Sequence, residues 1–164
     1  MRSAECGSLY VDEIRGGVVE ARHKVHAVAY HGNDRILTVG NPSFIVPMRS
    51  VAKPFMLRPL QEEADRHNIH ITPAMLSIMA SSHNGERAHR DLVEQILSLS
   101  DSSCTDLHCG SHLPYYSWLY DEYFTQQDIE KRQLFHNCSG KHAGMLLLAH
   151  LMGVPRNNYW EATH

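Results

Sequence analysis

The sequence predicts an α+β fold in which strands come first and helices follow. Residues 18–30 alternate in part between apolar and polar side chains, as a half-buried strand does. Residues 31–34, His-Gly-Asn-Asp, have the composition of a turn, and a second strand follows over residues 35–39. From residue 50 onward, apolar residues recur at helical spacing. Because no repeat or linker interrupts the pattern, residues 1–164 are expected to form a single domain.

The composition excludes several classes of protein. An apolar fraction of 43% and a charged fraction of 20% are typical of a globular protein. The net charge is −3, with basic residues scattered among acids, so no nucleic-acid partner is expected. No membrane segment is expected either, because no apolar run approaches the roughly 20 residues of a transmembrane helix. The N-terminus does not resemble a signal peptide, which predicts a cytoplasmic protein whose four cysteines are thiols or metal ligands.

The strand region is predicted in three pieces. Val19, Ala21 and Val25 share one parity, which favours one buried face over residues 18–30. Residues 35–39 form the returning strand, residues 40–42 break the chain, and residues 44–46 are a short third strand.

The helical region begins at residue 50, with Leu57, Leu60 and Ala64 on its apolar side. A second helix is predicted to have Thr72 as its N-cap and Pro73 at its first position. Further helices are expected over residues 86–99, near 118–124 and over 139–152, with a polar loop at 100–114. Gly153 ends the last helix.

Ser50 and Lys53 form a Ser-x-x-Lys pair where strands give way to helices. A serine hydroxyl is a weak nucleophile until a base takes its proton, and lysine can be that base. Positions three apart lie on one face of a helical turn. Arg49 is beside the pair, where it either lowers the pKa of Lys53 or binds a substrate carboxylate. Pro54 conflicts with a regular α-helical start, and a 3₁₀ first turn resolves the conflict. The alternative is an N-cap serine with a surface lysine.

Two further polar clusters follow. Residues 81–86, Ser-Ser-His-Asn-Gly-Glu, end the second helix. They serve either as a cap, with Asn84 or Ser82 as the N-cap of the next helix, or as a functional turn presenting Ser82 or His83. The second cluster, residues 137–145, begins the most apolar helix. Lys141 there opposes the helix dipole, which indicates a role other than stability. Cys138 is a packed thiol, a nucleophile or a metal ligand. Thirteen histidines are an unusual number, and a few are expected in a polar cleft or near a metal.

Together, four segments resemble the thermolabile L-asparaginase family found in rhizobia, other bacteria and fungi. They are Arg-Ser-Val-Ala-Lys-Pro-Phe at 49–55, Ser-Ser-His-Asn-Gly-Glu at 81–86, Cys-Gly-Ser-His-Leu-Pro at 109–114, and Asn-Cys-Ser-Gly-Lys-His-Ala-Gly-Met at 137–145. The resemblance spans residues 7–159. It implies a fold similar to serine β-lactamases and glutaminases.

The resemblance also implies roles for individual residues. Ser50 would be the nucleophile toward L-asparagine and Lys53 its general base, with Ser82 in a second Ser–Lys pair. Cys138 and Lys141 would be zinc ligands. The substrate-binding residues would be Arg49, His83 and Asn137.

Members of that family are about twice as long, so the C-terminal half of the fold is expected to be absent. The lysine that pairs with Ser82 and a third zinc ligand would then lie beyond residue 164, and the chain would have weak activity or none. A partial sheet exposes an edge, which predicts a homodimer or a complementing C-terminal chain.

Two alternatives remain open. One is a zinc-binding interaction module built on four residues, although their spacing is looser than the usual pattern: Cys104, His108, Cys109 and His112. The other is a catalytically inactive fragment that binds a partner.

Overall fold

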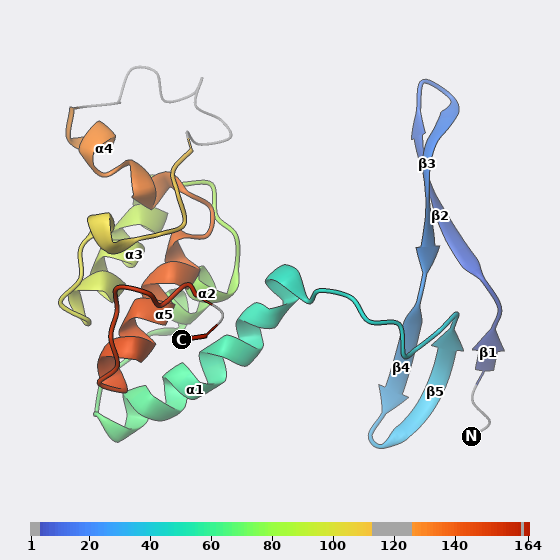
Figure 1. Cartoon of the computed structure of the whole chain (residues 1–164), viewed down its shortest axis with the longest axis horizontal. Helices are drawn as coiled ribbons and strands as arrows, with labels where there is room; N and C mark the ends of the chain where they lie inside the picture. The colour runs from blue at the N-terminus through green and yellow to red at the C-terminus, as the bar shows by residue number, and fades with distance from the viewer. Residues whose placement is uncertain (1–3, 113–125, 162) are drawn as a thin grey trace. The chain divides into compact units, whose positions relative to one another are not determined.

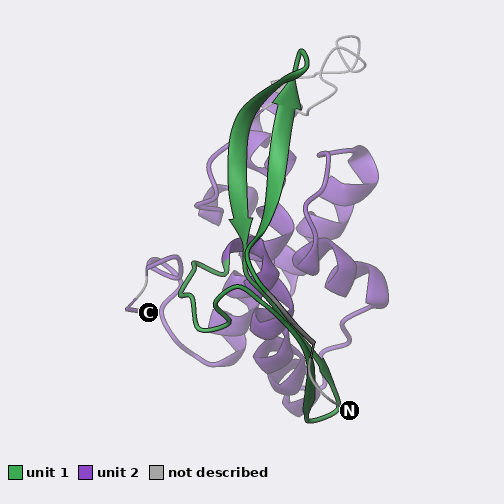
Figure 2. Ribbon diagram, turned by 90° about the vertical axis from the view of Figure 1, so that its right-hand side faces the viewer, with its two compact units in different colours: residues 1–48 green, residues 49–164 purple. Residues whose placement is uncertain are grey.

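A computed structural model describes residues 4–112, 126–161 and 163–164. The chain forms two compact units, residues 1–48 and residues 49–164, coloured green and purple in Figure 2. All the strands of the described residues belong to the first unit, and all the helices belong to the second.

The first unit contains two small sheets (Figure 1). One has the strand order β1-β5-β4, with β1 parallel and β4 antiparallel to β5. The other is the antiparallel pair β2-β3. The strand bounds are Ala4–Cys6 (β1), Leu9–Arg15 (β2), Val18–Val25 (β3), Ala27–His31 (β4) and Asp34–Val39 (β5).

The turns of both hairpins contain glycine. The predicted hairpin is confirmed as β4-β5, whose turn has Gly32 at φ +60°. The β2-β3 hairpin was not predicted. Its turn consists of Gly16 and Gly17 at φ +57° and +80°, the backbone of a tight turn that suits the strand twist.

The prediction of one continuous strand over residues 18–30 is wrong, because the chain changes sheets at His26. Its Nδ1 accepts a hydrogen bond from Asn41 N at 2.8 Å, and its ring stacks on Phe44 at 4.7 Å. Residues 44–46, predicted as a strand, are irregular instead. The predicted buried face is only partly present: Ala21 and Val25 are half-buried, whereas Val19 is 47% exposed.

The second unit is helical (Figure 1). Its α-helices are α1 (Lys53–Arg66), α2 (Pro73–Ala80), α3 (Arg87–Ser98), α4 (Gln126–Glu130) and α5 (Ser139–Leu151). In the described part of this unit, 3₁₀ turns accompany them at η1 (Arg49–Ala52), η2 (Cys104–Asp106) and η4 (Arg132–Phe135).

Helix α5 is the centre of this unit and packs against α1, α2 and α3. Nine of its thirteen residues are buried and the other four are half-buried, as expected of an apolar helix packed against several others. Leu146 and Leu147 are fully buried in the core with Leu60 of α1, Met79 of α2 and Ile96 of α3.

The helix ends test the sequence predictions directly. Thr72 caps α2 as predicted, with its Oγ1 accepting from Met75 N at 3.2 Å. Gly153 follows α5 at φ +66°, also as predicted. The N-cap of α3 is Glu86, so the prediction of Asn84 or Ser82 is wrong. The helix expected near residues 118–124 lies outside the described residues.

In the described part of the chain, no helix is long and apolar enough to span a membrane.

Candidate active site

The Ser-x-x-Lys pair lies at the junction of η1 and α1. The predicted 3₁₀ first turn is confirmed: Ser50 is in η1, and Lys53 is the first residue of α1. Arg49, just before Ser50, has φ +48°, a left-handed conformation that is costly for a residue with a side chain. Backbone strain of this kind concentrates at functional sites.

Lys53 is buried, with 4% of its surface exposed, which rules out the alternative of a surface lysine. Its Nζ donates to Ser81 O at 2.6 Å and to Ser82 Oγ at 3.5 Å. Helix α2 ends at Ala80 and Ser81 is extended, so the carbonyl of Ser81 is available to accept this bond. The Ser-x-x-Lys pair, which is the first polar cluster, and residues 81–86, which are the second, therefore meet at this amine.

Ser50 is exposed, and none of the hydrogen bonds among the described residues joins its hydroxyl to Lys53. No carboxylate within these residues forms an ion pair with Lys53. A buried amine without a carboxylate partner is the arrangement in which proteins use lysine as a base.

The third polar cluster, residues 137–145, also lies close to Lys53. Lys53 and Lys141 line one cavity of about 30 Å³ between α1, α2 and α5, together with Met79 and Gly144. Lys141 is half-buried on the first turn of α5. The two lysines that the sequence singles out thus border one small space.

His83 links the second and third clusters. The side chain is 5% exposed, and Nε2 lies 2.9 Å from Ser139 Oγ. Its Nδ1 accepts from Gly85 N at 3.1 Å, so this nitrogen carries no proton and Nε2 is the donor. Ser139 Oγ in turn donates to Leu134 O at 3.1 Å. Both ring nitrogens are therefore engaged within the chain.

Backbone contacts reinforce this link. His83 N donates to Asn137 O at 3.3 Å. A Cβ at Gly85 would lie 2.9 Å from Phe135 O, and one at Gly140 would overlap with Ile78 O. Only glycine allows these close approaches. Asn137 N donates to His112 Nε2 at 3.0 Å, which adds a fourth segment to the cluster.

Burial controls the titration of the polar groups here. Burial, with a smaller contribution from nearby positive groups that include Lys53 for His83 and Lys141 for His142, lowers the pKa of both histidines to about 4. Burial also raises the pKa of Tyr159, whose hydroxyl lies 2.8 Å from His142 Nδ1, to about 12. These histidines are therefore neutral near pH 7.

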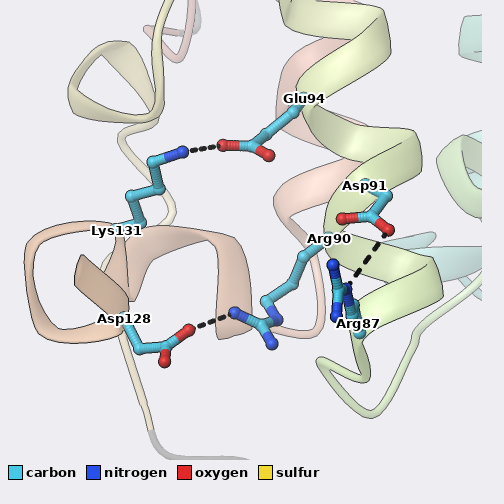
Figure 3. Close-up of polar contacts among 6 residues, drawn as sticks. All are labelled: Arg87, Arg90, Asp91, Glu94, Asp128 and Lys131. Carbon is cyan, nitrogen blue, oxygen red and sulfur yellow. Dashed lines mark hydrogen bonds and ion pairs between the residues drawn. The ribbon is translucent and has the colours of Figure 1, made fainter. Parts of the chain in front are cut away.

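Two ion pairs hold the segment before the third cluster against α3 (Figure 3). Arg90 Nη1 lies 2.5 Å from Asp128 Oδ1, and Lys131 Nζ lies 2.5 Å from Glu94 Oε1. The Arg90 guanidinium also lies 4.3 Å from the centre of the Phe135 ring. These ion pairs were not predicted from the sequence, although charged residues on a predicted helix face were a visible signal.

The predicted zinc ligands occupy the start of α5, where Cys138 is the N-cap and Lys141 follows on the first turn. Burial raises the pKa of the nearby Cys109 thiol to about 11, with Cys138 and Lys141 close enough to shift it in opposite directions. Within the described ranges, no three residues of the types His, Cys, Asp or Glu are grouped to hold a metal.

The alternative zinc module at residues 104–112 is not formed. His108 stacks on Trp160 at 3.6 Å, and His112 accepts from Asn137 N. Cys109 Sγ donates to Gly110 O at 3.4 Å. These side chains have separate partners.

A larger apolar hollow of about 660 Å³ lies between α1, α5 and the segment after α5, and its described lining contains none of the predicted site residues.

The sequence was compared with known proteins. No curated protein matches the chain. The sequence profile of the L-asparaginase II family matches residues 11–164, which include all three polar clusters described above. The chain belongs to the L-asparaginase II family.

Proposed function

We propose that this protein hydrolyses L-asparagine to L-aspartate and ammonia, with Ser50 as nucleophile and Lys53 as general base. The observation that carries the proposal is the position of Lys53 Nζ. It is buried one turn after Ser50 and within reach of the Ser82 hydroxyl, and no carboxylate of the described residues pairs with it. The family match supports the substrate.

In the first half of the reaction, Lys53 takes the proton of the Ser50 hydroxyl, and Ser50 Oγ attacks the side-chain amide carbon of the substrate. The C–N bond then breaks, and the proton passes to the leaving nitrogen, which departs as ammonia. The product on the enzyme is an aspartyl ester of Ser50.

In the second half, Lys53 takes a proton from water as the water attacks the ester carbon. The C–O bond to Ser50 breaks, the proton returns to Ser50 Oγ, and aspartate leaves. Ser82 lies 3.5 Å from the amine and assists these proton transfers.

Arg49 and Asn137 are the groups we assign to substrate binding. Arg49 is exposed beside Ser50, where its guanidinium can pair with the substrate carboxylate. His83 was also predicted to bind substrate, but both its ring nitrogens bond within the chain.

Zinc binding by Cys138 and Lys141 stays a prediction. Because the described residues supply two of its ligands, no step above uses a metal.

An ammonia-release assay on the purified chain tests the proposal. Wild-type protein is expected to release ammonia from L-asparagine at a low rate, and Ser50→Ala is expected to lose this activity. Ser98→Ala is the control, since Ser98 is an exposed serine that donates only to Gln95 O. Activity that survives Ser50→Ala, or no activity in the wild type, contradicts the proposal.

A second candidate is an interaction fragment, and the first unit favours it. Its sheet side chains Ile14 and Val18 are 65% and 68% exposed, and Tyr30 is 60% exposed. Large exposed apolar surfaces mark sites of association. Light scattering coupled to size-exclusion chromatography checks it: a monomer at all concentrations contradicts a homodimer.

A further inference from the structure

We propose that His83 is a positioning residue: its hydrogen bond to Ser139 fixes the turn that presents Ser81 and Ser82 to Lys53. This inference rests on the proposed function for its catalytic consequence, but its geometric part can be tested separately.

The argument begins with the turn itself. Residues 81–86 connect α2 to α3 and have no regular structure of their own, so other contacts must hold Ser82 in place. The Ser82 side chain bonds Lys53 at 3.5 Å, a long distance that gives it little hold on the turn.

His83 makes the stronger contact that holds the turn in place. Its buried ring bonds Ser139 Oγ at 2.9 Å, and Ser139 is itself fully buried on the first turn of the central helix. The Ser139 hydroxyl uses its proton for Leu134 O, so it can only accept from the histidine. The hydrogen bonds therefore all point one way: Gly85 N donates to His83, the histidine donates to Ser139 Oγ, and Ser139 Oγ donates to Leu134 O.

This direction requires a neutral ring with its proton on Nε2. The charged and titratable groups that face His83 are Lys53 from α1, His89 from α3, and His112 and His136 from the segments before α5. None is a carboxylate, and together with burial they disfavour an imidazolium. The environment thus maintains the proton arrangement that the bond to Ser139 needs.

The chain offers matched variants. In His83→Gln, an amide nitrogen can reach the place of Nε2 and still donate to Ser139. In His83→Asn, the oxygen can reach the place of Nδ1 and accept from Gly85 N, but nothing reaches Ser139. Ser139→Ala removes the acceptor. Ser100→Ala is the control for stability, since Ser100 is equally buried and bonds only Leu97 O through its hydroxyl.

The first measurement needs no substrate. Acetic anhydride modifies accessible lysines, and peptide mass spectrometry gives the rate at Lys53. We expect Ser139→Ala and His83→Asn to raise this rate on the order of 10-fold, as a loosened turn exposes the amine. His83→Gln and Ser100→Ala are expected to keep the wild-type rate. Equal rates in all variants, or faster modification in His83→Gln than in His83→Asn, overturn the proposal.

The second measurement is asparagine hydrolysis. Loss of positioning lowers kcat on the order of 10- to 100-fold with little change in KM, because the substrate-binding groups are untouched. If the modification rates at Lys53 follow the expected pattern but the wild type is inactive, the proposed function fails and the positioning role stands. If the wild type is active and Ser139→Ala does not change the modification rate at Lys53, the positioning role fails and the proposed function stands.

Discussion

His83 Nε2 and Ser139 Oγ lie 2.9 Å apart across 56 residues of sequence, both in the core of the helical unit. Through this contact the turn after α2 is fixed to the first turn of α5. The amine of Lys53 reaches the same turn from α1. Three polar clusters that are far apart in the sequence thus become neighbours.

Lys53→Met should separate activity from stability. The variant removes a buried charge but also leaves Ser81 O without its donor, so the free energy of unfolding should fall by no more than about 2 kcal/mol. Hydrolysis of asparagine should be lost. Urea unfolding and the ammonia assay check the two parts, and a loss of more than about 2 kcal/mol would show that the lysine has a structural role instead.

Stability should fall between pH 6.5 and 4 because of His83 and His142. Each has a pKa of about 4 in the folded protein against 6.5 for an ordinary histidine. In this window the unfolded chain binds the proton and the folded chain does not, so the stabilisation present above pH 6.5 is lost as the pH falls. Each histidine contributes up to about 3 kcal/mol.

The pH effect is measured by urea unfolding across this range. His142→Gln should flatten the dependence. An unchanged slope in His142→Gln contradicts the assignment.

Gly140→Ala should be strongly destabilising, because the added methyl group overlaps with Ile78 O. We expect a cost of about 1–3 kcal/mol from overpacking, and a loss of activity as α5 shifts away from α2. Gly7→Ala is the control, since a Cβ there meets nothing within 4 Å. Chemical unfolding of both variants gives the comparison, and equal stabilities would refute the close contact.

Asp128→Asn should cost more than Asp91→Asn. The Arg90–Asp128 pair is mostly buried, with side-chain exposures of 22% and 16%, so its loss leaves a charge poorly compensated. The Arg87–Asp91 pair is 89% and 56% exposed (Figure 3). Removing it should change stability by less than about 0.5 kcal/mol. Thermal unfolding ranks the two variants, and the reverse order would be inconsistent with the structure.

The helices were predictable because their signals are local. Thr72 followed by Pro73 determines the start of α2, and Pro54 after Lys53 forces the 3₁₀ turn that the structure contains. The helix predicted over residues 86–99 agrees with α3 to within one residue at each end, but its N-cap was wrongly predicted, because several residues with a capping preference occur in the turn before it and local preference alone does not choose among them.

The sheets were less predictable. The alternation over residues 18–30 continues across His26, yet the chain changes sheets there because His26 bonds Asn41 and stacks on Phe44. These are contacts between residues distant in sequence, and periodicity does not report them.

For the candidate site, the sequence suggested the residues, and the structure shows which of them lie together. Spacing suggested Ser50 and Lys53 as neighbours, whereas the amine bonds Ser81 and Ser82. The role of Ser139 had no sequence signal, since a serine at a helix start is usually a cap.

The most direct test of the proposed mechanism is to trap the acyl-enzyme. Wild-type protein is mixed with L-asparagine, quenched in acid and digested, and the peptide containing Ser50 is examined by mass spectrometry. We expect an aspartyl ester on Ser50 that is absent from Ser50→Ala and accumulates if water attack is slowed. An ester on Ser82, or ammonia release with no ester on any serine, would contradict the assignment of Ser50 as the nucleophile.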